Sequence, residues 1–351
     1  MAEAFRVAVL GLTHDHVWNN LHELQQSGRG TLVAAADPHP PLLDQVKHLY
    51  GCPVYSDPEA LLEREQLDAV YVFADNAAGA RLAELAADRG LHVLIEKPMA
   101  ASLEGADRML AAAQRGGSRL MVNWPFAWWP QMQHALHLAR AGSVGDVWQV
   151  KYRAAHAGPR EIGCSTYFCD WLYDHQRNGA GAFMDYCCYG AVLARCLLGM
   201  PGRVTGIAAR LCKEDILVED NAILVMAYAR ALAVAEGSWT QIGKLTGYLT
   251  AIYGNRGTLI VEPRAGGRLL LATAETPDGQ PVDLPPTMPE MRSASDHFLN
   301  ALAADQPFAD LCTARTCRDT QEILEAGLIS IGQGREVSLP LKSFLGHRPA
   351  E

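Results

Sequence analysis

Residues 90–98 read GLHVLIEKP, a short apolar run that ends in a carboxylate, an ammonium group and a proline. The four residues from His92 to Ile95 are too few for a helix and suit a buried parallel strand. Glu96 and Lys97 then fall at the carboxyl end of that strand, the edge where open α/β sheets bind ligands. A lysine there can donate to a substrate oxygen; the alternative is a solvated Glu-Lys pair in a loop.

The segments around this stretch alternate between strand and helix. Strand-like runs occupy residues 5–10, 31–36, 69–73 and 119–122, and helical patterns occupy 17–24, 41–50, 77–89 and 103–114. Alternation at this spacing predicts an α/β fold with a doubly wound parallel sheet. We therefore expect a Rossmann dinucleotide-binding domain over residues 1–123.

The pattern changes after Asn123. Residues 124–130 read WPFAWWP, which suits a crossing between domains. Strand-like runs then follow in close succession at 147–154, 204–210, 222–228, 232–239, 249–253 and 258–261, with helices expected at 131–141, 293–304 and 312–331. Strands joined by short turns predict a mostly antiparallel open sheet. Residues 124–345 are thus expected to form an α+β domain for substrate binding and oligomerisation.

Composition limits the class of partner. The formal charge is −9 and 20% of residues are charged, with no basic run, which argues against nucleic acid or an anionic membrane as partner. Neither a signal peptide nor a membrane span is evident, so a cytoplasmic location is expected. Nine scattered cysteines fit reduced thiols better than a disulfide framework.

The first strand leads into a modified glycine loop. Residues 11–16 read GLTHDH, so only the first glycine of the GxGxxG dinucleotide fingerprint is present. Thr13 and His14 remain able to donate to a phosphate at a helix N-terminus, although both histidines of the loop can instead simply begin a surface helix. Asp37 closes the second strand, where a carboxylate accepts hydrogen bonds from a ribose diol and repels a 2′-phosphate. NAD is therefore expected in preference to NADP.

The sequence gives little indication of a metal. His14 and His16 have no evident acidic or cysteine ligands beside them in the sequence, and the spacing of Cys164 and Cys169 is not that of a zinc site. We therefore predict no metal.

Four motifs together make the chain resemble the Gfo/Idh/MocA family of NAD(P)-dependent oxidoreductases. Residues 90–98 are similar to the family's AGKHVLCEKP signature, and residues 141–147 to its turn into the second domain. Residues 179–189, GAGAFMDYCCY, are similar to its GGGALxDxGxH stretch, and residues 254–259 to its GxxGTL hairpin. The family's usual histidine falls on Tyr189, as in members that resemble glucose-fructose oxidoreductase. Several other departures indicate an outlying subgroup.

The resemblance implies roles for particular residues. Lys97 would contact the substrate hydroxyl and the nicotinamide ribose, and Asp185 would lie in the substrate pocket. Coenzyme contacts are expected from the ends of the first strands: Gly11, Leu12, Thr13, His14, Asp37, Asn76, Glu96, Lys97 and Asn123.

The expected chemistry is proton transfer to or from a substrate hydroxyl during hydride transfer. Tyr189 is the candidate proton acceptor or donor, Lys97 its electrostatic partner, and Asp185 an orienting group. The alternatives are a Tyr189 hydroxyl satisfied by backbone and an Asp185 that caps its helix.

Substrate contacts are expected from the aromatic and polar residues near the domain crossing. Trp124, His156 and Tyr167 are the candidates. Trp124 is as readily a core residue, and the loop 155–178 as readily makes a subunit contact.

The favoured function is an NAD-dependent dehydrogenase or reductase of a sugar, cyclitol or similar polyol. The first alternative is an enzyme that keeps NAD bound and uses it transiently, for epimerisation, elimination or glycoside cleavage. The second is a catalytically silent NAD-binding regulatory protein. A homodimer or homotetramer through the C-terminal sheet is also expected.

Overall fold

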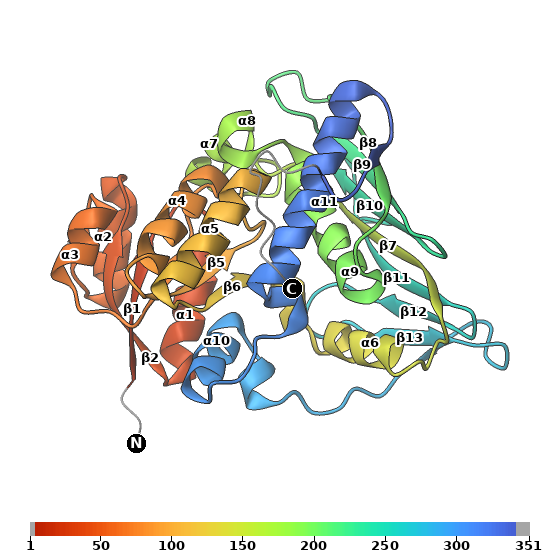
Figure 1. Ribbon diagram of the computed structural model, residues 1–351, viewed down its shortest axis with the longest axis horizontal. Helices are drawn as coiled ribbons and strands as arrows, with labels where there is room; N and C mark the ends of the chain where they lie inside the picture. Colours follow the sequence, from red (N-terminus) through yellow and green to blue (C-terminus); the bar gives the residue numbers. More distant parts are fainter. Residues whose placement is uncertain (1–3, 342–351) are drawn as a thin grey trace.

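The computed structural model describes residues 4–341, which form two sheets with helices packed on and between them (Figure 1). The first sheet has six parallel strands in the order β3-β2-β1-β4-β5-β6. They are β1 (Phe5–Leu10), β2 (Gly30–Ala36), β3 (Val54–Tyr55), β4 (Ala69–Val72), β5 (His92–Glu96) and β6 (Leu120–Asn123). This order is that of a doubly wound dinucleotide-binding sheet, so the predicted fold class is confirmed.

Helices connect these strands, and their limits follow local capping chemistry. They are α1 (His16–Ser27), α2 (Pro40–Tyr50), α3 (Pro58–Arg64), α4 (Asn76–Ala87) and α5 (Leu103–Gly116). The Asp75 side chain caps α4 by accepting from the Ala78 amide at 2.7 Å, and Ser102 caps α5 through the Gly105 amide at 3.2 Å. Among the elements of this first sheet and its helices, the sequence patterns missed the short pair β3 and α3.

The second sheet has nine strands in the order β14-β13-β12-β11-β7-β10-β9-β8-β15. Its strands are β7 (Val147–Ala155), β8 (Arg203–Ala209), β9 (Asn221–Ala227), β10 (Leu232–Ser238), β11 (Tyr248–Gly254), β12 (Thr258–Val261), β13 (Leu269–Ala272), β14 (Gln280–Pro281) and β15 (Val337–Ser338). All pairs are antiparallel except β7 with β10, which run parallel. The mostly antiparallel sheet is thus as expected.

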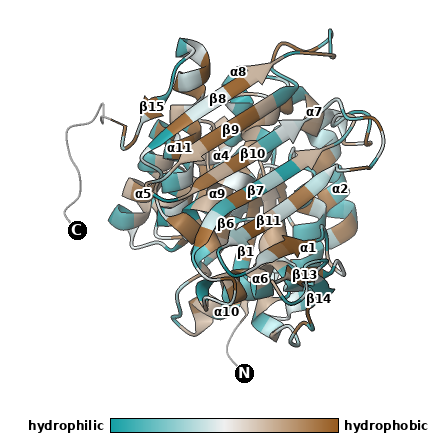
Figure 2. Ribbon diagram, turned by 90° about the vertical axis from the view of Figure 1, so that its right-hand side faces the viewer, coloured by the Kyte–Doolittle hydropathy of each residue, from teal (hydrophilic) through white to brown (hydrophobic). Residues whose placement is uncertain are grey.

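The inner face of this second sheet is covered by α9 (Cys188–Leu198) and α11 (Ala314–Gln333). α9 packs against β7 and β10, while α11 packs against β8 and also against α5 of the first unit. Figure 1 shows both helices between the two sheets. No helix of the described chain covers the outer face of the second sheet, which is turned to the viewer in Figure 2.

A helix that follows the strands β13 and β14 packs against the first unit. α10 (Ala294–Ala303) packs against α1, and the Tyr71 hydroxyl on β4 donates to Ser295 Oγ at 3.0 Å. The division at residue 123 did not anticipate this contact. The stretch His175–Leu198 is long and apolar enough to span a membrane, but 72% of its apolar window is buried in the protein, as in a core helix.

Candidate active site at the carboxyl edge of the parallel sheet

The turn between β1 and α1 is built around Gly11. Its φ of +81° is accessible to glycine, and a Cβ there would lie 2.6 Å from the backbone nitrogen of Ala74. Asp37, at the end of β2, accepts from the Leu12 amide at 2.7 Å and from the amide of His39 at 2.8 Å. Together with the strand order, this tight turn and the buried carboxylate beside it form the framework on which Rossmann domains hold a dinucleotide.

Lys97 meets Asp185 in the interior between the two sheets. The Lys97 Nζ to Asp185 Oδ1 distance is 2.8 Å, and Lys97 is only 3% exposed. Burial alone lowers the pKa of Lys97, but Asp185, Cys188 and Glu96 together outweigh burial and raise that pKa above its ordinary value. The lysine is therefore a cation at neutral pH, and a proton donor or clamp rather than a base.

Asp185 is held in a π-helical turn, Phe183–Cys187, that leads into α9. Such turns interrupt helices frequently at functional sites. The second oxygen of Asp185 accepts from the indole of Trp239 at 3.2 Å, so both oxygens have partners and the residue is not a helix cap. The sequence analysis missed Trp239, whose only signal was its place at the end of a predicted strand.

Tyr189 lies beside this pair. Lys97 Nζ is 5.0 Å from the centre of the Tyr189 ring, and Tyr152 stacks on that ring with the centroids 5.4 Å apart. Burial, with the Cys188 thiol and the Glu96 carboxylate nearby, raises the pKa of Tyr189 well above 10. A raised pKa favours the protonated phenol, so of the two predicted roles, proton acceptor and proton donor, this arrangement favours the donor.

Glu96 lies in a buried polar group next to Lys97. Its Oε1 is 3.0 Å from Nδ1 of His16, and its Oε2 accepts from Asn123 Nδ2 at 2.7 Å. His14 packs edge-on against Phe168 with ring centroids 4.6 Å apart. Burial, followed by the positive charges of His16 and Lys97, lowers the pKa of His14 well below 6.5.

The predicted substrate residues separate in the structure. His156 lies near the Lys97–Asp185 pair, and the centroid of its ring is 5.3 Å from that of Tyr186. Burial lowers the pKa of His156. Trp124 is buried, lies 5.5 Å from the Tyr189 ring and donates its indole N–H to Cys317 Sγ at 3.3 Å. Tyr167 instead packs against His39, which is two residues after Asp37, with the ring centroids 5.1 Å apart.

A segment of the second unit covers the predicted coenzyme residues. α7 (Thr166–Leu172) begins at Ser165, whose hydroxyl donates to Asp15 Oδ1 at 2.5 Å and whose amide donates to Asp15 Oδ2 at 2.8 Å. The Trp171 indole reaches the Thr13 carbonyl at 3.4 Å. α7 therefore lies across the loop that would face a pyrophosphate.

The short helix after α7 packs over the carboxyl end of β4 at the same edge of the sheet. α8 (His175–Asn178) brings Arg177 to 3.0 Å from Asp75 and Asn178 to 2.8 Å from the side-chain amide of Asn76. A void of about 10 Å³ lined by Ala74, Asn76 and Glu96 remains here, far smaller than the several hundred Å³ of a cofactor site. The residue types fit a dinucleotide, and α7 and α8 contact the residues that would hold one.

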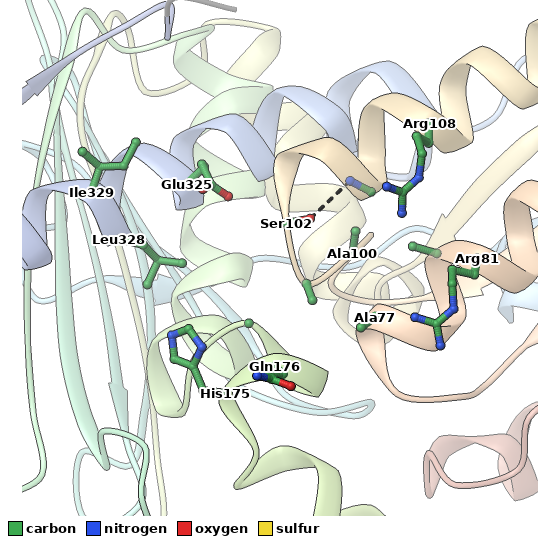
Figure 3. Close-up of a pocket in the computed structure, with 14 residues that line it drawn as sticks. Ala77, Arg81, Ala100, Ser102, Arg108, His175, Gln176, Glu325, Leu328 and Ile329 are labelled. Carbon is green, nitrogen blue, oxygen red and sulfur yellow. Dashed lines mark hydrogen bonds between the residues drawn. The ribbon is translucent and has the colours of Figure 1, made fainter. Parts of the chain in front are cut away.

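A much larger cavity of about 570 Å³ lies elsewhere, between α4, α5, α8 and α11. Figure 3 shows Arg81 and Arg108 on one side of it and Glu325, Leu328 and Ile329 on the other. None of the residues predicted from the sequence lines this cavity. Its mixed charge marks no particular ligand class.

Two family models match the chain. Residues 5–124 match the model described as "Oxidoreductase family, NAD-binding Rossmann fold", and residues 132–260 match the Gfo/Idh/MocA C-terminal domain.

Among curated relatives, D-apiose dehydrogenase from Paraburkholderia graminis is 34% identical over 140 residues, covering 39% of this chain and 37% of the relative. The 1-carboxy-3-chloro-3,4-dihydroxycyclohexa-1,5-diene dehydrogenase from Comamonas testosteroni is 38% identical over 195 residues, covering 53% and 45%. The chain thus spans less than half the length of these relatives.

Among solved structures, the aldose-aldose oxidoreductase from Caulobacter crescentus superimposes with a TM-score of 0.82 at 21% identity, covering 96% of this chain and 100% of that chain. That likeness supports the fold. With matches to both of the family's domains, the chain belongs to the Gfo/Idh/MocA oxidoreductase family.

Proposed function

We propose that the protein transfers hydride between a nicotinamide coenzyme and a secondary alcohol or ketone of a sugar, cyclitol or similar polyol. The observation that carries the proposal is the buried Lys97–Asp185 pair beside the Tyr189 ring, at the carboxyl edge of a Rossmann sheet. The bound coenzyme supplies the hydride acceptor or donor. The relatives' names, which refer to a sugar and a cyclic diol, support the substrate class.

The residues of the chain supply positioning and proton transfer. Lys97 is a buried cation that holds a substrate oxygen and stabilises negative charge on it during reaction. Asp185 fixes the ammonium group from one side, since its carboxylate is anchored by Trp239. The Tyr189 hydroxyl, which stays protonated, donates to the oxygen of a ketone during reduction.

NAD is the proposed coenzyme rather than NADP. Asp37 is buried at the end of β2 and accepts hydrogen bonds from neighbouring amides, so its side chain is held in place next to the glycine turn. A carboxylate in that place favours a ribose diol and opposes a 2′-phosphate.

Because α7 packs on the loop between β1 and α1, we expect this contact to weaken coenzyme binding. Ser165→Ala removes the hydroxyl bond to Asp15, so the open form should become more populated and the apparent Kd for NAD should fall by about 3- to 10-fold. Calorimetric titration of the wild type and the variant measures this. Thr313→Ala, which removes an N-cap hydroxyl from α11 away from α7, serves as the matched control.

A polyol panel monitored by coenzyme absorbance tests the activity itself. Net reduction of NAD with at least one sugar or cyclitol supports the proposal. Turnover with unchanged NAD would instead show transient use of the coenzyme, and tight NAD binding without turnover would show a regulatory protein. No binding of either coenzyme by the wild type or Ser165→Ala would overturn the proposal.

We also propose that the outer face of the nine-stranded sheet buries itself against a second copy of the chain. Ile207 and Ile223 are paired in register on β8 and β9 and are 65% and 41% exposed, and Trp148 and Leu232 are exposed on neighbouring strands. Ile223→Lys should then shift the mass in sedimentation from dimer or tetramer towards monomer. Leu217→Lys, in an exposed loop, should not change it, and a monomeric wild type would contradict the proposal.

A further inference from the structure

We infer that His14, His16 and Glu96 form a binding site for a divalent transition-metal ion of the zinc class. One nitrogen of each histidine and a carboxylate oxygen of Glu96 lie within 4.8 Å of one another. Two imidazoles and one carboxylate are a ligand set that zinc and related ions use when further coordination positions stay open. The loop spacing alone did not indicate this site, because Glu96 comes from β5, 80 residues further along the chain.

The ring of His14 gives the independent sign that a ligand is missing. Its Nε2 is buried without a hydrogen-bond partner, and the residue is 1% exposed. A buried polar atom without a partner costs about 1–3 kcal/mol. A ligand at Nε2 removes that cost.

The other ring nitrogen of His14 has only a weak partner. Neutral imidazole is the form that binds a metal. Nδ1 accepts from the His16 amide at 3.2 Å, a long contact. Coordination through Nε2 places the ring proton on Nδ1 and exchanges this contact for the metal bond.

Glu96 is already oriented as a ligand would be. Asn123 Nδ2 donates to its Oε2 at 2.7 Å, and the Trp128 indole fixes Asn123 by donating to Oδ1 at 2.8 Å. Such outer hydrogen bonds hold metal-binding carboxylates in place and tune their affinity. The other oxygen, Oε1, lies 3.0 Å from Nδ1 of His16, a second ligand of the proposed site.

The charge balance favours a cation over an anion. A phosphate at His14 would be repelled by the Glu96 carboxylate. The neighbour of that carboxylate, His16, carries a positive charge only if it is protonated. The Lys97 ammonium group is already paired with Asp185 at 2.8 Å. A divalent ion supplies the positive charge that this buried carboxylate lacks.

The geometry leaves a route for entry. The His16 side chain is 40% exposed, whereas that of Glu96 is 3% exposed, so the ion reaches the site from the His16 side. Ligand atoms of a tetrahedral zinc with bonds of about 2.0 Å are about 3.3 Å apart. The partly exposed His16 ring can turn to close the remaining distance.

Metal binding by the full-length protein tests the inference without any coenzyme. After chelator treatment, the protein is titrated with Zn²⁺ by calorimetry and with Co²⁺ by visible absorption. One equivalent per chain is expected, with d–d bands typical of nitrogen and oxygen ligands and with affinity that falls at acidic pH, where protons compete with the metal for its ligands.

Variants assign the ion to this cluster. His14→Asn and His16→Asn should each weaken binding by about 10- to 100-fold or more. The double variant His134→Asn/His137→Asn is the matched control, because these two rings stack on helix α6 (Pro130–Arg140) with centroids 5.9 Å apart and are the obvious adventitious site. His16→Asn changes a half-exposed ring, so folding should persist, and thermal unfolding checks it.

Three results of the metal titrations would overturn the inference. They are binding of no ion by the wild type, binding lost in the His134/His137 control instead, and a cobalt–thiolate charge-transfer band that places the ion on cysteine. Binding of inorganic phosphate or NAD that depends on His14, without any metal binding, would assign the ring to an anion and also overturn it. Since coenzyme uptake is measured separately, failure here leaves the proposed hydride transfer standing.

Discussion

Replacing Lys97 by methionine should lower kcat/KM for the best polyol substrate by about three orders of magnitude. The side chain of similar length removes the ammonium group that lies 2.8 Å from Asp185 and 5.0 Å from the Tyr189 ring centre. A buried cation aimed at developing negative charge contributes about 10²–10³-fold, and loss of substrate orientation adds to this. Steady-state kinetics at saturating coenzyme measure the change.

The control for this prediction has to separate lost catalysis from lost stability. Lys97→Met leaves the Asp185 carboxylate buried without its cation, which costs about 3–5 kcal/mol of unfolding free energy. The double variant Lys97→Met/Asp185→Asn removes both charges and should recover much of that stability while remaining inactive. A folded double variant with wild-type turnover would refute the role of the pair.

The parallel sheet could be predicted from the sequence because its signals are local. The strand at His92–Glu96 has buried residues on both faces, so a short apolar run followed by polar residues is enough to locate its end. Once the strands were in order, Lys97 and Asp37 had to fall at the ligand-binding edge. The convergence of Lys97, Asp185 and Tyr189 was obtained through family resemblance, because 88 residues separate the lysine from the aspartate.

The packing of α7 over the carboxyl edge of the parallel sheet could not be predicted from the sequence. The contact of Ser165 with Asp15 joins segments 150 residues apart, and hydrophobic periodicity carries no information on which surfaces meet. For the same reason, the contact of Trp239 with Asp185, the packing of α10 on α1 and the approach of Glu96 to His14 and His16 could not be predicted. The protonation state of Tyr189 also escaped prediction, since its pKa depends on burial by Tyr152, Trp124 and other rings that only the fold assembles.

Removing the hydroxyl of Tyr189 should have the second largest effect on catalysis. Tyr189→Phe should lower kcat for ketone reduction by about 10²-fold with little change in KM, because the phenol is the proposed proton donor to the substrate oxygen. The ring itself stays in place, since Tyr152 stacks on one side and Phe126 meets it edge-on at 5.1 Å. Folding stability should therefore change little.

The pH profile and a neighbouring tyrosine decide whether that loss is chemical. Because the pKa of Tyr189 is raised well above 10, the phenol stays protonated through neutral pH and its own titration should not appear in the reduction rate there. Tyr152→Phe removes a hydroxyl from the same buried aromatic cluster and should retain most activity, which makes it the matched control. If both variants lost rate equally, or if Tyr189→Phe raised KM at constant kcat, the hydroxyl would be a binding or packing group, and proton donation would have to be assigned to Lys97, whose raised pKa keeps it protonated over the same range.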